Sequence, residues 1–402
     1  MVAADEIKRK IEQNWLEFLY ANSAKLSLKT FTGGTPPSVF VGRSGYPKVK
    51  VGPMVSPICS DTRILDMPEM WPGKAIGDII NYRLSLIRGV IPGIDVYRPS
   101  GKYIESLQEL AMANKSANAE AVFEKRPIVD VEQRKDHVAS VENAPFGLVA
   151  PLKSFKACSS LSADHSIENA HYDKDLSATE AIVRLYQCGI EVSRIQRVLS
   201  MGMLGLQKNR RLVPTRWSVS ATDDVISSRL IAQVESCPTI NFFEVYKHSH
   251  IGNHYSIILL PDDVWNFEVQ EAWFDNNGNL GMACDFENAN GLDHYPSVAG
   301  AYFAAKLGVA EHLSNRGRKG AALVLREIHP EYVMPVGVWQ IREGVREALK
   351  RQGTQFDSFE RALYFACIKS SVSVKEWIGN SLMRRNMTQQ KRITEFIDKD
   401  FS

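Results

Sequence analysis

The sequence lacks the closely spaced cysteines of a structural zinc site or a disulfide framework. Its six cysteines are scattered along the chain, and no pair has the spacing Cys-x-x-Cys. Zinc ribbons and small disulfide-stabilised folds are therefore excluded as classes. Some of these cysteines, such as Cys367, lie within apolar runs, where a reduced, buried thiol acts as a small hydrophobe.

Long apolar runs and a strong charge of one sign are absent too. Apolar runs such as Tyr255 to Leu260 are far too short to cross a bilayer, and the N-terminus has no apolar signal-peptide core. We therefore expect a cytoplasmic protein without membrane partners. The net charge is only +2, so a surface for nucleic acid would have to come from local basic clusters.

Length and element order predict an α+β protein with two domains. At 402 residues the chain exceeds a single ordinary core. We expect an N-terminal domain over 1–280, with a mixed antiparallel sheet and helices. A smaller, mostly helical region follows over 281–385, and a short tail over 386–402. The turn-rich stretch from Asn276 to Gly291 marks the expected boundary.

Several local signals predict individual elements. A capping box from Ser177 to Glu180 predicts a helix start, and the similar segment beginning at Ser220 predicts another. The run 321–328 predicts a strand within the helical C-terminal part. Three earlier runs, rich in aromatic and β-branched residues, predict successive antiparallel strands: 242–246, 255–260 and 264–273.

A hairpin-like element near the N-terminus has a loop, called here the hairpin loop, that contains Gly42, Arg43, Gly45 and Lys48. Glycines allow close backbone approach, and the Arg43 and Lys48 side chains would hold a phosphate. A plain glycine-containing hairpin turn explains the same residues. Because Gly-Lys-(Ser/Thr) is missing, this loop is not a Walker A motif.

The densest basic stretch, called here the basic segment, runs from Lys208 to Trp217. Cations beside a tryptophan suit a strand of nucleic acid, through phosphate contacts and base stacking. A solvated basic loop is the alternative. The candidate nucleic-acid contacts in this segment are Lys208, Arg210, Arg211, Arg216 and Trp217.

Acidic and histidine-rich segments offer candidate metal ligands. Asp223 and Asp224 are candidate catalytic carboxylates for a divalent cation, although carboxylates in a first helical turn also complement the helix dipole. His248 and His250 would share one face of a strand, so a metal site is geometrically possible, but a polar hairpin connection is the simpler and favoured explanation for these histidines.

The last residues have the spacing of the peptide that docks on DNA sliding clamps, the PIP box. In that binding mode one helical turn gathers Ile393, Phe396 and Ile397 into an apolar plug, while Gln390 fills a polar pocket beside it. The alternative is an amphipathic helix that packs on the protein's own core.

Three stretches in this order resemble the archaeal Nre ("novel archaeal repair") family: Pro37 to Val49, Asn209 to Ser218, and Gln390 to Ile397. The resemblance implies a DNA-damage repair protein whose tail binds the sliding clamp (PCNA). Many relatives begin with a cysteine-rich zinc finger, whereas the first cysteine here is Cys59, so no zinc cofactor is carried over.

Two function classes follow from these observations. The leading hypothesis is a DNA repair protein that its PIP box recruits to the clamp, with DNA as a further candidate partner. The alternative is an enzyme that transfers nucleotidyl groups or cleaves phosphodiesters at a basic phosphate-binding cleft, with a divalent cation. The second hypothesis expects Arg43, Arg216 and Asp223 in one cleft.

Overall fold

The computed structural model describes residues 2–129, 147–158, 161–275, 278–292 and 294–384. The chain divides into two compact units, of which unit 1 comprises 1–226 with 333–340, and unit 2 comprises 227–332 with 341–402. The boundary expected at residue 280 therefore falls inside unit 2. Within the described ranges, no helix combines the length and apolar character that a membrane span needs.

Unit 1 is built on a mixed sheet with the strand order β1-β5-β7-β4-β3-β2, and β6 pairs with β7. The β4–β7 pair is parallel and the other pairs are antiparallel. The hairpin expected from the sequence is confirmed, since β2 pairs with β3. The strands are β1 Thr30–Thr35, β2 Val39–Val41, β3 Lys48–Val55, β4 Ile87–Asp95, β5 Ala117–Phe123, β6 Ile128–Val129 and β7 Leu148–Ala157.

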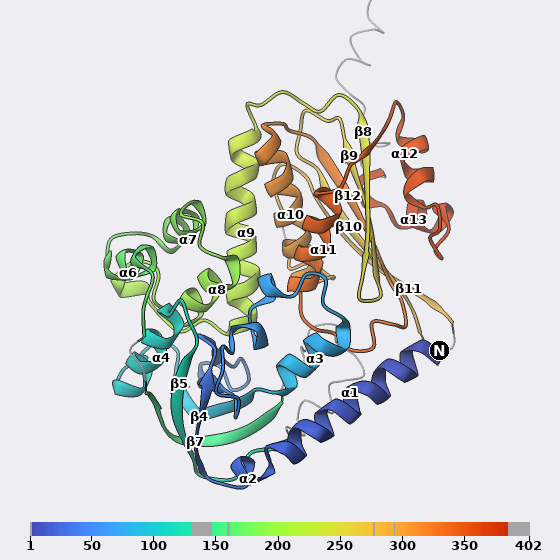
Figure 1. The fold of residues 1–402 in the computed structure, drawn as a ribbon. Helices are drawn as coiled ribbons and strands as arrows, with labels where there is room; N and C mark the ends of the chain where they lie inside the picture. Colours follow the sequence, from blue (N-terminus) through green and yellow to red (C-terminus); the bar gives the residue numbers. More distant parts are fainter. Residues whose placement is uncertain (1, 130–146, 159–160, 276–277, 293, 385–402) are drawn as a thin grey trace, which may run out of the picture. The chain divides into compact units, whose positions relative to one another are not determined.

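The helices of unit 1 alternate along the chain with the strands of this sheet or follow them (Figure 1). The capping box is confirmed, because the Ser177 hydroxyl accepts from the Glu180 amide and the Glu180 carboxylate accepts from the Ser177 amide. Every residue of α8 is buried. The helices are α1 Val2–Ala21, α2 Ser23–Leu26, α3 Ile76–Leu84, α4 Lys102–Met112, α6 His165–Tyr172, α7 Ala178–Gln187, α8 Val192–Ser200 and α9 Thr215–Val234, and α9 continues into unit 2.

Unit 2 contains a second mixed sheet, with the order β11-β10-β12-β9-β8-β13. Helices α10 and α11 cover one face of this sheet, and α12 and α13 cover the other (Figure 1). Two covered faces explain why β12 is buried from Ala321 to Glu327. The elements are β8 Phe243–His250, β9 Asn253–Leu260, β10 Phe267–Phe274, β11 Leu280–Glu287, β12 Ala321–Ile328, β13 Thr354–Phe356, α10 Gly300–Arg316, α11 Trp339–Leu349, α12 Phe359–Ala366 and α13 Val374–Asn380.

The α+β class and the strand over 321–328 are confirmed, but two local predictions, the pairing of β9 with β10 and the helix start at Ser220, are wrong. Strand β10 is not the neighbour of β9, because β12 inserts between them and pairs with β10 in parallel. Strand β11 lies between the two predicted turn segments and pairs with β10 along its whole length, and the second turn is present, since the Gly291 amide donates to the Asn288 carbonyl at 2.9 Å. Helix α9 begins at Thr215, so Ser220 lies inside the helix.

The last described residues are fixed to the sheet of unit 2 by one carboxylate. Glu268, on β10, is fully buried and accepts from the Met383 amide at 2.6 Å and from the Ser381 hydroxyl at 3.0 Å. The Leu382 amide donates to the same carboxylate at 3.3 Å. Met383 itself is buried in the core with residues of α12 and α13. The chain is thus part of unit 2 up to Arg384.

We predict that Gly52→Ala destabilises unit 1 by about 3 kcal/mol, because a β-carbon at Gly52 would lie only 1.7 Å from the Gly89 carbonyl oxygen and would push β3 away from β4. Urea unfolding of the full chain measures the effect. Gly77→Ala is the matched control. Its new methyl group would lie 3.7 Å from Ile11, an ordinary contact, and alanine favours the helix. Equal midpoints for the two variants would contradict the prediction.

We predict that Glu268→Ala loosens the end of the described chain without unfolding the sheet. Removal of the carboxylate leaves the buried Met383 amide without its acceptor, at a cost of about 1–3 kcal/mol. Hydrogen exchange read by mass spectrometry should show faster exchange over 381–384, with unchanged protection in β9. Unchanged exchange over 381–384 would show that other contacts hold this end.

Candidate functional site

Three segments of unit 1 that are far apart in the sequence are joined by hydrogen bonds to the backbone. The Leu212 amide donates to the Val96 carbonyl at 2.9 Å, and the Val96 amide donates to the Pro47 carbonyl at 3.0 Å. The Val41 amide donates to the Thr215 hydroxyl at 3.0 Å. These bonds place the basic segment against the hairpin loop and the end of β4.

Exposed aromatic side chains from these three segments meet at the junction. The Tyr46 ring centroid lies 5.2 Å from that of Trp217 and 6.2 Å from that of Tyr97, and the two tyrosine hydroxyls lie 3.0 Å apart. This hydrogen bond is the main reason that the pKa of Tyr46 is raised. The exposed fractions are 39% for Tyr46, 52% for Tyr97 and 45% for Trp217. We call these three residues the aromatic cluster.

Cationic side chains flank the aromatic cluster. The Arg211 guanidinium carbon lies 5.7 Å from the centroid of the Tyr97 ring, a cation–π contact. Arg43 and Lys48 belong to the same hairpin loop as Tyr46, and both are exposed. Lys208 is exposed in the short 3₁₀ helix Gln207–Asn209. Of the predicted cations, Arg211 therefore contacts the cluster directly, and Arg43 and Lys48 belong to the loop that carries one of its rings.

Arg210 has a different position from its neighbours. Its guanidinium donates to three backbone carbonyl oxygens, those of Gly205 at 2.7 Å, His171 at 2.6 Å and Asp173 at 2.8 Å. It thereby ties the basic segment to helix α6 and the residue that follows it. Desolvation lowers the pKa of this group. These contacts give Arg210 a structural role in holding the segment.

The remaining predicted residues lie on α9. Asp223 is fully buried and accepts from the Gln196 side-chain amide at 3.0 Å, whereas Asp224 is half-buried. Arg216 is also half-buried. Asp223 is thus buried and bonded to α8, whereas Arg43 is exposed in the hairpin loop. Among the residues that the structure describes, no group of three or more His, Cys, Asp or Glu side chains is arranged to hold a metal ion.

The histidine-rich segment of unit 2 forms the β8–β9 hairpin. The rings of His248 and His250 stack with centroids 6.1 Å apart, as expected for residues on one strand face. His254 stacks instead on His329, with centroids 4.1 Å apart, and the His329 ring nitrogen lies 2.9 Å from the Glu327 carboxylate. The polar hairpin connection is thus the role that the geometry supports for this segment.

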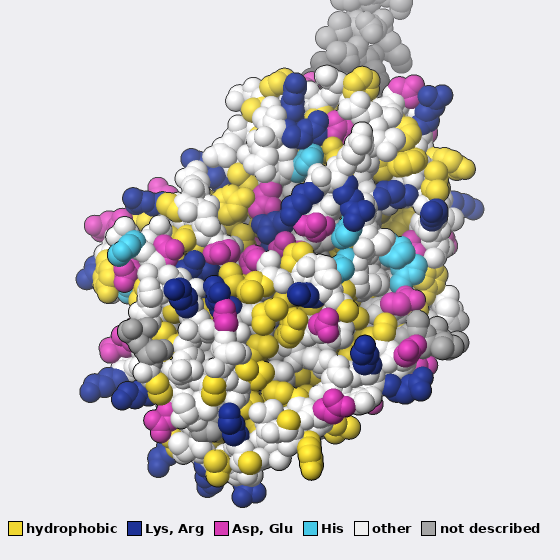
Figure 2. Space-filling view, viewed as in Figure 1, with side chains coloured by type: hydrophobic (Ala, Val, Ile, Leu, Met, Phe, Trp, Pro, Cys, Tyr) yellow, Lys and Arg dark blue, Asp and Glu magenta, His cyan; other side chains and the backbone are white. Residues whose placement is uncertain are grey.

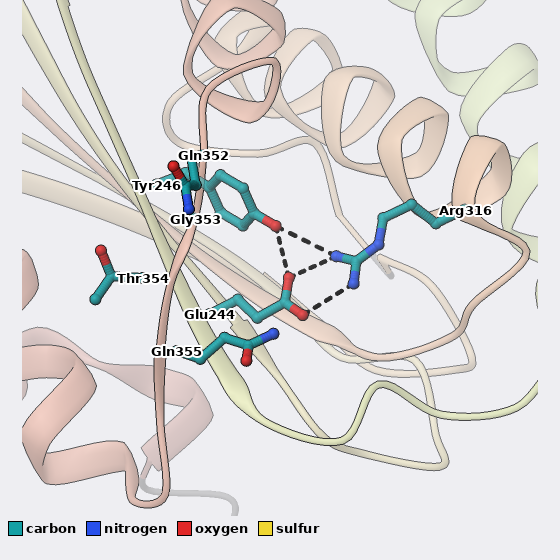
Figure 3. A pocket seen from close by; sticks show the side chains of 7 residues that line it. All are labelled: Glu244, Tyr246, Arg316, Gln352, Gly353, Thr354 and Gln355. Atoms are coloured by element: carbon teal, nitrogen blue, oxygen red, sulfur yellow. Dashed lines mark hydrogen bonds and ion pairs between the residues drawn. The ribbon is translucent and has the colours of Figure 1, made fainter.

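Unit 2 also has a polar pocket of about 660 Å³ that sequence reasoning missed (Figure 3). The Arg316 guanidinium forms a two-pronged ion pair with Glu244, with N–O distances of 2.5 and 2.9 Å. The Tyr246 hydroxyl donates to the same carboxylate at 2.6 Å. Arg316 and Glu244 lie 72 positions apart in the sequence, so no local pattern points to their pairing. The pocket is lined by Glu244, Tyr246, Arg316, Gln352, Gly353, Thr354 and Gln355.

The pair of Arg316 and Glu244 is internally neutralised. Hydrogen bonds from Arg316 and Tyr246 outweigh the burial of Glu244 and lower the pKa of its carboxyl group. The same carboxylate helps to raise the pKa of the Tyr246 hydroxyl, for which burial is the main cause. The groups therefore hold one another in fixed charge states, which is typical of a structural network rather than of a site that exchanges protons.

Comparison with known proteins shows which protein family this chain belongs to. Two family models match it, one described as "Archaeal Nre, N-terminal" over residues 10–277 and one as "Archaeal Nre, C-terminal" over residues 287–396. The chain belongs to the archaeal Nre family. The resemblance drawn from the three sequence stretches is thereby confirmed. No solved structure matches the chain.

Curated relatives cover most of the chain. A DNA repair protein named NreB from Archaeoglobus fulgidus is 37% identical over 371 residues, which are 91% of each chain. A DNA repair protein named NreA from the same organism is 34% identical over 85% of each chain. A DNA repair protein NreA from Haloferax volcanii is 34% identical over 82% of this chain and 81% of its own.

Both signs of charge are distributed over the face of this Nre-family chain that is drawn in Figure 2, where Lys and Arg side chains alternate with Asp and Glu. This distribution agrees with the net charge of +2. A field of one sign does not cover that face, so an anion-binding surface there would have to come from local groups. The residues of the predicted PIP box, Gln390, Ile393, Phe396 and Ile397, lie outside the described residues.

We predict a pH-dependent loss of stability from His312. Burial, helped by the Arg316 charge, lowers the pKa of His312 to about 4 from an ordinary value of 6.5. As the pH falls from 6.5 towards 4, the unfolded chain takes up a proton that the folded chain does not, so the free energy of unfolding falls. Above pH 6.5 both states are neutral and this contribution is constant.

Urea unfolding of the wild type and His312→Gln at pH 7.5 and pH 5 tests this prediction. The wild type should lose more stability between the two pH values than His312→Gln does. The comparison at pH 7.5 is the control, because it isolates the loss of ring contacts with Tyr246, whose centroid lies 5.2 Å from that of His312. An equal loss for both proteins would show that His312 titrates normally in the folded state.

Proposed function

We propose that this chain is a DNA-damage repair protein whose C-terminal segment recruits it to the DNA sliding clamp, PCNA. The observation that carries the proposal is the spacing of Gln390, Ile393, Phe396 and Ile397. Membership of the archaeal Nre family supports the repair role, since the relatives described above are named DNA repair proteins. The C-terminal family match runs to residue 396, so it includes the first three of these positions.

The chemistry of the segment supports clamp binding. At helical spacing, the side chains of Ile393, Phe396 and Ile397 form one apolar side that fits a hydrophobic groove. Lys391 and Arg392 lie between the motif positions and add positive charge, which speeds encounter with an acidic rim or with DNA. The motif therefore contains both an apolar anchor and a charge that favours association.

The anchorage of the preceding residues supports the same function. Glu268 and the core hold the chain up to Arg384, so the motif begins close to a fixed point of unit 2. The stretch from Arg384 to Gln390 spans at most roughly 20 Å, even when fully extended. A clamp bound to the motif would therefore keep unit 2 at a high local concentration beside DNA.

Removal of the segment tests the proposal. A chain that ends at Met387 retains every described contact of unit 2, including those of Ser381 and Met383 with Glu268. We expect this variant to have an unchanged unfolding midpoint and no measurable affinity for the cognate clamp in calorimetry. Clamp affinity equal to that of the full chain would contradict the proposal.

A point substitution gives the finer test. We predict that Phe396→Ala weakens clamp binding by about 2 kcal/mol, about 30-fold in Kd, because a buried aromatic anchor is lost. Glu395→Ala is the matched control, since residue 395 lies between the apolar positions and off the predicted binding side. Its affinity should stay within about 3-fold of the wild type. Equal losses for both variants would contradict the predicted binding side.

A further inference from the structure

The aromatic cluster of unit 1 is a contiguous exposed surface assembled from three segments. Tyr46 comes from the hairpin loop, Tyr97 follows β4, and Trp217 is in the first turn of α9. Each ring contacts a neighbouring ring of the cluster, and each residue keeps at least 39% of its surface exposed. Aromatic groups that pack on one another at the surface, rather than in a core, are typical of a binding surface.

The groups around the rings define the charge of a suitable partner. Arg211 lies against Tyr97, and the exposed Arg43 and Lys48 come from the loop that carries Tyr46. The nearby carboxylate of Asp95 is half-buried and accepts from the Tyr97 amide at 2.9 Å, so it caps the turn. Rings flanked by cations suit a partner with flat apolar faces and a regular series of negative charges.

We propose that this surface binds single-stranded nucleic acid, with bases stacked on Tyr46, Tyr97 and Trp217 and phosphates held by Arg43, Lys48 and Arg211. Unpaired bases offer their faces to aromatic side chains and phosphates follow at every nucleotide, whereas bases in a duplex stack on one another and leave only their edges accessible. The inference deepens the proposed function, and rests on it for the choice of DNA over RNA, by naming a ligand for the body of the protein.

The architecture around the cluster suits this ligand. The rings are positioned by backbone hydrogen bonds of Val96, Leu212 and Val41, so their arrangement exists before the ligand arrives. A preformed surface loses little conformational entropy on binding. Arg210 contributes by holding the basic segment from behind, through its three carbonyl acceptors, and it does not contact the ligand.

Fluorescence anisotropy with labelled oligothymidylate of about 20 nucleotides tests the proposal on the full chain. We expect Trp217→Ala and Tyr46→Ala each to raise the Kd about 10-fold, and Trp217→Phe and Tyr46→Phe to bind within about 3-fold of the wild type because a ring is retained. Tyr20→Ala is the matched control, since Tyr20 is 85% exposed on α1 of the same unit. Urea unfolding of each variant confirms that the fold is intact.

The salt dependence separates the cations from the rings. Arg43→Ala and Arg211→Ala should each reduce the slope of log Kd against log salt by about 0.7, the value for one phosphate contact with a single strand. Arg184→Ala, on the exposed side of α7, should leave the slope unchanged. An abasic strand of the same length should bind about 10-fold or more weakly than oligothymidylate, because it offers phosphates without base faces.

Five results would overturn the proposal: no binding of oligothymidylate, equal affinity for the abasic strand, equal or tighter binding of a duplex, tighter binding of oligouridylate than of oligothymidylate, or no effect of Trp217→Ala. The chain that ends at Met387 separates this inference from clamp recruitment. It should keep the oligothymidylate affinity of the full chain while losing the clamp. A variant that loses only clamp binding does not contradict the nucleic-acid site. A failure to bind oligothymidylate does not contradict clamp recruitment.

Discussion

The candidate surface of unit 1 depends on hydrogen bonds that run from backbone to backbone or to one hydroxyl. The basic segment is held by Leu212 and Thr215, and the residue that joins it to the hairpin loop is Val96. These bonds use none of the side chains proposed to contact a ligand, and the guanidinium that also holds the basic segment belongs to Arg210, so the backbone frame of the site does not depend on the ligand-contacting groups. Its chemistry can therefore be altered by substitution while its scaffold persists.

Local signals in the sequence were sufficient for part of the fold. The capping box at Ser177, the β2–β3 hairpin and strand β12 each depend on residues within a few positions of one another, and all three are confirmed. The same kind of signal failed at Ser220, because helix α9 starts earlier and its N-terminal turn is held through Thr215 and the hairpin. Polar residues inside a partly buried helix imitate a helix start.

What the sequence left open depends on contacts between distant segments. The insertion of β12 between β9 and β10 joins residues that are widely separated, and no local pattern encodes that choice. Asp223 was a candidate catalytic carboxylate, but it is fully buried and accepts a hydrogen bond from Gln196 on α8. Conversely, Tyr46 and Tyr97 carried no individual signal, and only the structure shows that they meet Trp217. Clamp docking by the PIP box stays a prediction from sequence.

The carboxylate of Glu268 also determines how a mechanical load would enter the protein. Glu268 belongs to β10, which has β11 on one side and β12 on the other, and its carboxylate accepts a hydrogen bond from the Met383 amide. A pull on the C-terminal segment would be transmitted to β10, a strand next to the sheet edge, where backbone ladders on both sides share the force. A terminal helix without such a link would unfold from its end one turn at a time. Here the hydrogen bonds of residues 381–383 to Glu268 would have to break together.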